Sequence, residues 1–329
     1  MVSYKVFRGT PEGKIVSDTV ERELQNHEVF IETTHSGVCG TDKLYQPSGI
    51  VLGHEGVGVI REVGSSAALA TTAAQARNLR VLGNNSTDLA ADLDQYCRER
   101  QIYGFSDTDN GSFSYGAVWD SKTVAPIPDG YDSADAAPLL CAGATVYTVL
   151  TKYGLRSQDR VGVMGIGGLG HLAIKLAAAK GAHVVVFSSS ESKRQEALDY
   201  GASEFIVFKS GDEAPENFKP VKHLLLCGSS NVDYSSLVPL VDTDGVIYPL
   251  TAALESTPVP LTSLSLKGIR VQGSLVSSRD SLRKLLDFAA RKNIKPTIMT
   301  YPLNEEGIEK ALHDLKEGKV RYRAVLVKE

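Results

Sequence analysis

Four residues of the chain have the chemistry of zinc ligands. Cys39 lies in the stretch SGVCGTD, and His54 and Glu55 follow fifteen positions later in LGHEGVG. Cys141, in LLCAGATVY, is the third candidate after Cys39 and His54. Two thiolates and one imidazole leave the fourth position of a tetrahedral zinc ion open, which is typical of catalytic zinc. Glu55 is a candidate for a fourth ligand that binds and leaves. Each residue alone has an ordinary explanation, since a lone cysteine usually packs as a small hydrophobic side chain.

A glycine-rich turn lies further along the chain. Gly165, Gly167 and Gly170 form the pattern GxGxxG between the apolar run RVGVM and the helical pattern LGHLAIKLAAAKG. The first glycine permits a tight turn, the second lets a pyrophosphate approach the backbone, and the third lets helix and strand pack closely. The pyrophosphate would lie at the helix N-terminus, where free N–H groups favour an anion. Gly168 and Leu169 complete the turn, so the pattern predicts a dinucleotide site.

The end of the next strand distinguishes NAD from NADP. An NAD site places an acidic side chain there for the ribose 2′-hydroxyl. This chain has Ser188, Ser189 and Ser190, followed by Lys193 and Arg194. Hydroxyls and cations suit a 2′-phosphate, so the sequence favours NADP(H). The alternative is that Lys193 and Arg194 are solvated residues of a helix.

The chain has two regions with different patterns of predicted secondary structure, and these elements would position the candidate groups. The first 130 residues contain short Val, Ile and Gly runs between turn residues, which predicts an irregular β-rich region. Residues 133–154 have a helical pattern, with Ser133 as N-cap and Gly154 as the stop. The following stretch alternates strand and helix patterns, which predicts a parallel sheet with crossover helices. Helices over 279–293 and 305–318 precede a last strand.

The composition describes a globular protein of two domains. The chain has 329 residues, of which 42% are hydrophobic and 22% charged. A net charge of −4 argues against a nucleic-acid or membrane-surface partner, and neither a signal peptide nor a membrane span is expected. The four cysteines are too widely spread for a disulfide framework, so a reducing, cytoplasmic compartment is expected.

The motifs GVCGTD, GHE and LLCAGATVY, in this order around GxGxxG, resemble the zinc-dependent medium-chain dehydrogenase/reductase superfamily, most closely its cinnamyl-alcohol-dehydrogenase-like branch. The resemblance weakens only between residues 65 and 97. It implies an α/β protein with a GroES-like β-rich catalytic domain over 1–141 and a Rossmann domain, a doubly wound parallel sheet, over 142–275. Residues 276–329 would return to the catalytic domain. The active site is expected between the domains, and members are commonly homodimers.

The resemblance also implies roles for single residues. The two candidate cysteines and His54 would hold the catalytic zinc, with Glu55 behind or on it. Thr41 would hydrogen-bond the substrate oxygen, and Asp42 would accept a hydrogen bond from the ring of His54 and so orient it. Zinc would act as a Lewis acid that polarises a carbonyl group.

The implied reaction is the NADPH-dependent reduction of a small aldehyde, or the reverse oxidation of an alcohol. Thr145 and Ser274 would adjoin the nicotinamide that supplies the hydride. One alternative is a biosynthetic reductase of an iminium (C=N) or a conjugated C=C bond. A second is a nucleotide-binding scaffold without catalysis, although a scaffold has no need of an open metal position.

The sequence departs from this family at the structural zinc. The family usually carries that ion on four cysteines, but this chain has Gly83, Ser86 and Leu89 at three of the positions and only Cys97 at the fourth. One ligand cannot form a closed tetrahedral site. We therefore expect one catalytic zinc per chain and no structural zinc.

A second departure concerns proton transfer. Leu44 occupies the place where the family usually has a histidine that ends a proton relay to solvent. Leucine can neither donate nor accept a proton, so the relay is interrupted. Lys43, Tyr45 or water could replace the histidine, or the reaction could require no protonation of an oxygen.

Overall fold

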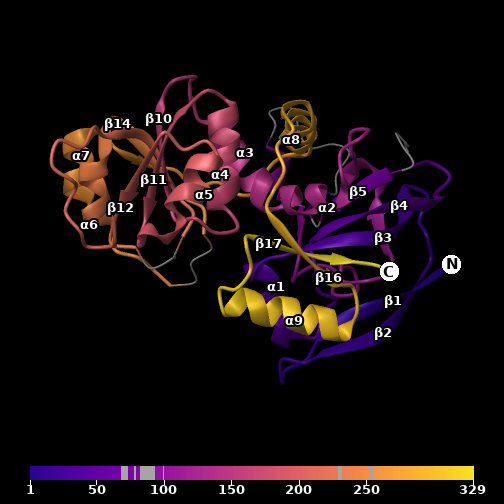
Figure 1. Ribbon diagram of the computed structural model, residues 1–329. Helices are drawn as coiled ribbons and strands as arrows, with labels where there is room; N and C mark the ends of the chain where they lie inside the picture. Colours follow the sequence, from indigo (N-terminus) through magenta and orange to yellow (C-terminus); the bar gives the residue numbers. More distant parts are fainter. Residues whose placement is uncertain (68–72, 78, 82–92, 99, 229–231, 252–254) are drawn as a thin grey trace. The chain divides into compact units, whose positions relative to one another are not determined.

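The structure, a computed structural model, describes residues 1–67, 73–77, 79–81, 93–98, 100–228, 232–251 and 255–329. The chain forms two compact units (Figure 1). Unit 1 comprises Met1–Ala144 and Ser277–Glu329, and unit 2 comprises Thr145–Val276. Both termini lie in unit 1, where residues 28–38 (indigo) and residues 323–327 (yellow) form neighbouring strands of one sheet.

The main sheet of unit 1 brings the zinc-ligand motifs together. Its strands follow the order β16-β17-β3-β4-β5-β9, and β8 also pairs with β3. Gly37 pairs with Val325 on one side and with Glu55 on the other, so the last strand lies beside the first two motifs. The strands are β3 (Glu28–Val38), β4 (Glu55–Val63), β5 (Ala73–Arg77), β8 (Ala117–Asp120), β9 (Ala125–Pro126), β16 (Ile298–Pro302) and β17 (Arg323–Val327).

Smaller elements complete unit 1. Two further pairs of strands form two-stranded antiparallel sheets: β1 (Val2–Gly9) with β2 (Ile15–Arg22), and β6 (Leu79–Val81) with β7 (Arg100–Ile102). The helices are α1 (Gly40–Tyr45), α2 (Ser133–Ala136), α8 (Arg279–Lys292) and α9 (Glu305–Lys316), with 3-10 turns η1 (Gln46–Ser48), η3 (Asp94–Tyr96), η4 (Ser121–Thr123) and η5 (Ala137–Leu140).

The two last helices form as their sequences predict. In α8 the side chains of Leu282, Leu285, Leu286 and Ala289 are buried, which is the spacing of one helix face. Ser278 caps its N-terminus by accepting a hydrogen bond from the Ser281 amide. Asn304 caps α9 in the same way, and the strand β17 follows.

Unit 2 is a Rossmann fold. Its strands have the order β12-β11-β10-β13-β14-β15 and are all parallel. In chain order this is 3-2-1-4-5-6, the arrangement of dinucleotide-binding domains. The strands are β10 (Arg160–Met164), β11 (His183–Ser188), β12 (Glu204–Val207), β13 (Val221–Leu226), β14 (Val241–Pro249) and β15 (Arg270–Val271).

Helices accompany the sheet of unit 2. The central strands read as nearly continuous apolar runs, such as VVVF in β11, because helices cover a parallel sheet on both faces. The helices are α3 (Ala142–Lys152), α4 (Gly170–Ala179), α5 (Arg194–Asp199), α6 (Tyr234–Leu237) and α7 (Leu261–Lys267), with 3-10 turns η6 (Glu191–Lys193) and η7 (Val238–Leu240).

The helix expected over residues 133–154 is interrupted. Its N-cap is Asp132, whose side chain accepts from the Ala134 amide, and the prediction of Ser133 as the cap was wrong. The helical pattern passes through η5, which contains Pro138, and resumes as α3 only after Cys141. Proline has no amide hydrogen and restricts the residue before it, so the chain bends there.

The region where the family resemblance weakens contains β5 and β6 among its described residues. Next to Cys97 the described residues form the 3-10 turn η3. The positions Gly83, Ser86 and Leu89 lie outside the described residues.

Within the described ranges, no single helix is long and apolar enough to cross a membrane. Only the segments Ser133–Leu140 and Ala142–Lys152, taken as a pair bent by 62°, meet the criteria of length and composition.

Candidate active site

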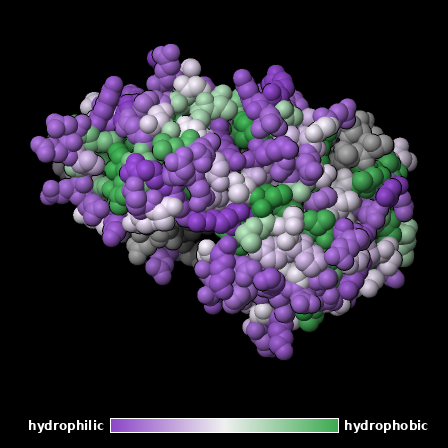
Figure 2. All heavy atoms as spheres, viewed as in Figure 1, coloured by the Kyte–Doolittle hydropathy of each residue, from purple (hydrophilic) through white to green (hydrophobic). Residues whose placement is uncertain are grey.

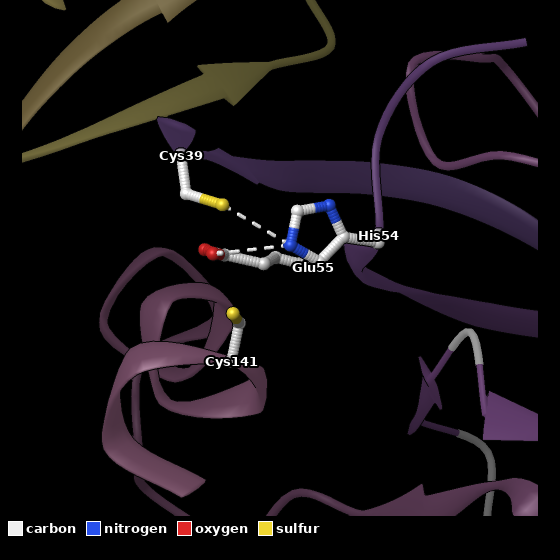
Figure 3. Close-up of side chains that lie close together, drawn as sticks. All are labelled: Cys39, His54, Glu55 and Cys141. Atoms are coloured by element: carbon white, nitrogen blue, oxygen red, sulfur yellow. Dashed lines mark hydrogen bonds and ion pairs between the residues drawn. The ribbon is translucent and has the colours of Figure 1, made fainter. Parts of the chain in front are cut away.

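The four predicted ligands form one cluster within unit 1. The donor atoms of Cys39, His54, Glu55 and Cys141 all lie within 4.8 Å of one another. Cys39 Sγ lies 3.2 Å from His54 Nε2, which lies 3.9 Å from a carboxylate oxygen of Glu55. Figure 3 shows the sulfur of Cys39 and the carboxylate of Glu55 directed at this nitrogen, with Cys141 facing them from the helical segment opposite.

Local structure explains how Cys39 is held. Cys39 directly follows β3 and is the N-cap of α1, where its sulfur accepts a hydrogen bond from the Thr41 amide at 3.4 Å. The carboxylate of Asp42 returns to the Cys39 amide at 2.9 Å. This reciprocal pair is a capping box, in which a cysteine stands in the place of the usual serine or threonine. The cap therefore fixes both the backbone and the sulfur of a ligand.

The ring of His54 is oriented by a carboxylate. Asp42 Oδ1 lies 2.7 Å from His54 Nδ1, so the hydrogen of the ring is on Nδ1 and Nε2 is free to ligate. Tyr103 donates its hydroxyl to the same oxygen at 3.1 Å, and its ring lies against His54 with 4.9 Å between centroids. Asp42 is fully buried and so joins the backbone of one ligand to the ring of another.

Glu55 occupies a space that a glycine leaves open. Its carboxylate lies beside Gly37 on the neighbouring strand, where an added Cβ would overlap Oε2. The other carboxylate oxygen, Oε1, accepts a hydrogen bond from Arg323 of β17. Glu55 and Arg323 are both buried, with exposed fractions of 0% and 5%.

The ionisable groups of the cluster shift one another's pKa. A hydrogen bond from the second cysteine, together with the positive charge of His54, lowers the pKa of Cys39 well below the ordinary thiol value despite burial. Burial disfavours a charged His54, but the charges of Asp42 and Cys39 outweigh it and raise the pKa of that ring. Burial raises the pKa of Glu55 to about 7 against the opposing charge of Arg323. The lowered pKa of Cys39 favours a thiolate within the cluster.

The donor set fits a zinc ion. Glu55 Oε2 is buried without a hydrogen-bond partner among the described residues, and it belongs to the same cluster as two sulfurs and an imidazole nitrogen. These are the ligand types that zinc prefers, and thiolate is available at Cys39. No other such cluster of three or more His, Cys, Asp or Glu side chains occurs in the part of the chain that the structure describes.

The glycine turn of unit 2 has an open cradle. Gly165 has a φ of +92°, and an added Cβ there would lie 2.7 Å from Gly228 Cα. A Cβ on Gly170 would overlap the carbonyl oxygen of Gly165, which accounts for the close approach of α4 to the turn. A Cβ on Gly167 would meet no described atom within 4 Å. The turn therefore leaves room above Gly167, at the N-terminus of a ten-residue helix, for a phosphate group.

The strand end after β11 presents hydroxyls. Ser188 is buried, whereas Ser189 and Ser190 are exposed in the turn that follows. Lys193 reaches back to the glycine turn and donates to the Ile166 carbonyl at 2.7 Å. Arg194 turns away, because it pairs with Glu191 and donates to the Phe205 carbonyl. Of the two cations that the sequence offered, Lys193 is the one near the turn.

Comparisons with known proteins agree with this geometry. Residues 25–129 match the family described as "Alcohol dehydrogenase GroES-like domain", and residues 168–291 match "Zinc-binding dehydrogenase". A probable cinnamyl alcohol dehydrogenase 1 of Aralia cordata is 34% identical over 93% of this chain and 89% of its own length. The chain belongs to the zinc-dependent medium-chain dehydrogenase/reductases. Within them it belongs to the cinnamyl-alcohol-dehydrogenase-like branch.

Two further relatives of this dehydrogenase extend the comparison. NADP-dependent alcohol dehydrogenase 6 of Saccharomyces cerevisiae is 29% identical over 93% of this chain and 90% of its own length. The solved structure of a cinnamyl alcohol dehydrogenase of Sorghum bicolor superimposes with a TM-score of 0.87 at 26% identity, over 99% of this chain and 98% of the other. The GroES-like and Rossmann folds expected from the sequence are confirmed.

The remaining predicted residues of the dehydrogenase occupy definite places. Thr145 lies on α3, one helical turn after Cys141, and is buried. Ser274 carries a buried hydroxyl without a partner among the described residues. Leu44 is 47% exposed, and Lys43 donates to the Gln46 side chain at 2.5 Å.

Three residues that shape this site were not predicted from the sequence. Arg323 lies 268 positions from Glu55, and only the pairing of β17 with β3 brings it near. Gly37 begins the motif GVCGTD, but the sequence does not show that the Glu55 carboxylate fills the space that its missing side chain leaves. Tyr103 follows the stretch of weakest resemblance and has the appearance of an ordinary core tyrosine in the sequence.

Proposed function

We propose that this protein is a zinc-dependent oxidoreductase that transfers hydride between NADPH and a small aldehyde or alcohol, with carbonyl reduction favoured. The observation that carries the proposal is the convergence of two thiols, an imidazole and a carboxylate within 4.8 Å in a member of this family. Relatives whose names specify cinnamyl alcohol or NADP support the substrate class and the cofactor. One zinc ion and no structural zinc per chain remain part of the proposal.

Residues of unit 1 would prepare the reaction. Cys39, His54 and Cys141 would hold the zinc, with Glu55 as a ligand that alternates with its bond to Arg323. When bound, zinc supplies a Lewis acid for the carbonyl oxygen. Asp42 keeps the hydrogen of His54 on Nδ1, and the hydroxyl of Thr41 would donate to the substrate oxygen and pass on its proton. Because Leu44 interrupts the relay, that proton would come from Lys43, Tyr45 or water.

Residues of unit 2 would bind NADPH. The pyrophosphate would lie over Gly167, Gly168 and Leu169, between the tight turn at Gly165 and the helix start at Gly170. The 2′-phosphate would accept hydrogen bonds from Ser188, Ser189 and Ser190, with Lys193 as the cation. Thr145 and Ser274 would contact the nicotinamide, and the buried Ser274 hydroxyl, which has no hydrogen-bond partner among the described residues, supports that role.

Isotope transfer tests the proposal. The purified protein is supplied with NADPH that carries deuterium at C4 of the nicotinamide and with cinnamaldehyde, and the products are analysed by mass spectrometry. We expect deuterium on the carbinol carbon of cinnamyl alcohol, with NADH much less effective than NADPH. Deuterium on a former alkene carbon would favour the alternative C=C reductase, and transfer to an imine without transfer to any aldehyde would favour the C=N reductase.

A homodimer in the cytoplasm completes the proposal. The end strand β15 of the Rossmann sheet contains Val271, which is 39% exposed, and nearby Leu261 and Leu266 on α7 are 73% and 83% exposed. Figure 2 shows apolar surface in the region where Figure 1 places α7. An apolar sheet edge of this kind favours pairing with a second copy. Sedimentation equilibrium tests this, and a monomer at micromolar concentration would reject it.

All four cysteines lie in the described part of the chain as free thiols, which suits a reducing compartment.

A further inference from the structure

Tyr103 contacts the ring of His54, the amide of the preceding Gly53 and the carboxylate that orients the ring. Its hydroxyl accepts a hydrogen bond from the Gly53 amide at 2.8 Å and donates one to Asp42 Oδ1 at 3.1 Å. Its ring lies against the imidazole of His54, with 4.9 Å between centroids and 31° between planes. A hydroxyl has one hydrogen, so the amide donor and the carboxylate acceptor together determine its orientation.

Asp42 is the group through which Tyr103 would act. This carboxylate is fully buried and accepts three hydrogen bonds, from His54 Nδ1, from the Tyr103 hydroxyl and from the Cys39 amide. Because a buried carboxylate keeps its place only while its donors hold it, each donor restricts the direction of the others. The Tyr103 hydroxyl and His54 share Oδ1, so loss of the hydroxyl frees the oxygen that aims the imidazole.

Tyr103 is itself held in place. The ring of Tyr45 packs edge-on against it with 5.4 Å between centroids, and Phe105 packs edge-on against Tyr45 at 5.9 Å. Gly104 permits this approach, since a Cβ there would lie 2.6 Å from Cζ of Tyr45. The aromatic rings thus run in contact from His54 to Phe105, which is 74% exposed.

We propose that Tyr103 is a positioning residue of the metal site. It holds Asp42, and through Asp42 the imidazole of His54, in the orientation that presents Nε2 to the metal. The inference rests on the proposed function, because it requires zinc in the cluster of Cys39, His54, Glu55 and Cys141.

The first test compares two tyrosine-to-phenylalanine variants. Tyr103→Phe removes the hydroxyl and keeps the ring. Tyr301→Phe is the matched control, because Tyr301 is also buried in unit 1 and donates to the carboxylate of Asp314 at 3.1 Å. We expect Tyr103→Phe to release zinc to a coloured chelator about tenfold faster than the wild type, as is typical for groups behind a metal ligand, and Tyr301→Phe to match the wild type. Equal release by both variants would overturn the proposal.

Cobalt gives a second readout that loss of packing alone would not change. Co²⁺ is loaded in place of zinc, and its visible absorption reports the ligand geometry. We expect Tyr103→Phe to shift these bands and Tyr301→Phe to leave them as in the wild type. In a double-mutant cycle, Tyr103→Phe added to Asp42→Ala is expected to have little further effect on zinc release. Independent effects of the two substitutions would show that Tyr103 does not act through Asp42 and would overturn the proposal.

A measurement on protein with the hydroxyl intact covers the case in which Tyr103→Phe does not fold. 3-Fluorotyrosine is placed at position 103 of the full chain, or at position 301 as control, and the fluorine resonance is recorded before and after zinc removal. We expect the resonance at 103 to move and the one at 301 to stay, and an unmoved resonance at 103 would overturn the inference. A wild-type protein that binds no zinc would instead reject the proposed function, so the two failures are distinguishable.

Discussion

At the scale of single residues, the metal site depends on Gly37 as much as on its ligands. Gly37 pairs with Glu55 across β3 and β4, and the Glu55 carboxylate fills the volume that a side chain would take. The same carboxylate is tied to Arg323 through one oxygen and leaves the other without a partner among the described residues. The missing side chain of Gly37 therefore determines where the Glu55 carboxylate can lie.

Substitution of Gly37 tests this dependence. Gly37→Ala forces either the Glu55 carboxylate or the strand to move, and we expect the free energy of unfolding to fall by about 1–3 kcal/mol, as for other overpacked core positions. Gly40→Ala is the control, because a Cβ there would meet no described atom within 4 Å, and we expect no loss of stability. Chemical denaturation measures both. Equal stability of Gly37→Ala and the wild type would show that the space beside Glu55 is not needed.

The candidate ligands and the Asp42 partner of His54 were predictable from the sequence, whereas the Arg323 partner of Glu55 was not. Cysteine and histidine are scarce in this chain, and Cys39, His54 and Cys141 lie in motifs typical of a zinc site. They can therefore be identified as candidate ligands from the sequence. Arginine is common on surfaces, and nothing near Arg323 in the sequence distinguishes it from a solvated strand residue. Its burial follows from strand pairing over 268 positions, which only the folded sheet establishes.

At the scale of elements, apolar runs predicted the Rossmann strands because a parallel sheet is buried on both faces. The apolar runs do not predict the contacts between polar side chains at the ends of those strands. Arg160 of β10 reaches across β11 to Glu204 of β12, with hydrogen bonds of 2.6 and 3.1 Å, and His183 of β11 lies 2.6 Å from the same carboxylate. One carboxylate thus joins three neighbouring strands.

This link gives the stability of unit 2 a pH dependence. Arg160, more than His183, lowers the pKa of Glu204 to about 2, below its unfolded value near 4.5. A lowered carboxyl pKa stabilises the fold above the unfolded pKa, and this contribution is lost as the pH falls toward 2. The Glu204 side chain is 39% exposed, so solvent limits the effect to about 0.5–1 kcal/mol.

Glu204→Gln should therefore lower the melting temperature at pH 7, and the difference from the wild type should shrink by more than half at pH 3. Glu213→Gln, which alters an exposed carboxylate of the same unit, is the control and should show no such change. A Glu204→Gln effect that is equal at both pH values would contradict the assignment of the shift to this carboxylate.

Helix boundaries were less predictable than strands. Residues 133–154 do form helices, as their sequence predicts. Pro138 and the 3-10 turn that contains it separate α2 from α3, with Cys141 between the turn and α3. The cap at Asp132 in place of Ser133 is a shift of one residue between two side chains that both cap helices well.

At the scale of the whole molecule, an ion pair joins two distant parts of unit 1. One part is the lobe around Cys97, where the family resemblance weakens, and the other is the helix α8. Asp94, at the start of η3, accepts a hydrogen bond of 2.7 Å from Arg279, which begins α8 185 positions later. An ion pair between segments so distant in sequence leaves no local pattern, and the fold alone reveals it.

The family resemblance and the cluster of ligands lead to one central claim, that a single catalytic zinc serves this dehydrogenase. The most direct test is the zinc content of protein purified without added metal or chelator, measured by elemental analysis beside the variant Cys141→Ser. We predict close to one zinc per wild-type chain and strongly reduced zinc in the variant. A wild-type protein without zinc that still reduces aldehydes with NADPH would contradict the account, and two zinc ions per chain would show that the lobe near Cys97 retains a metal site.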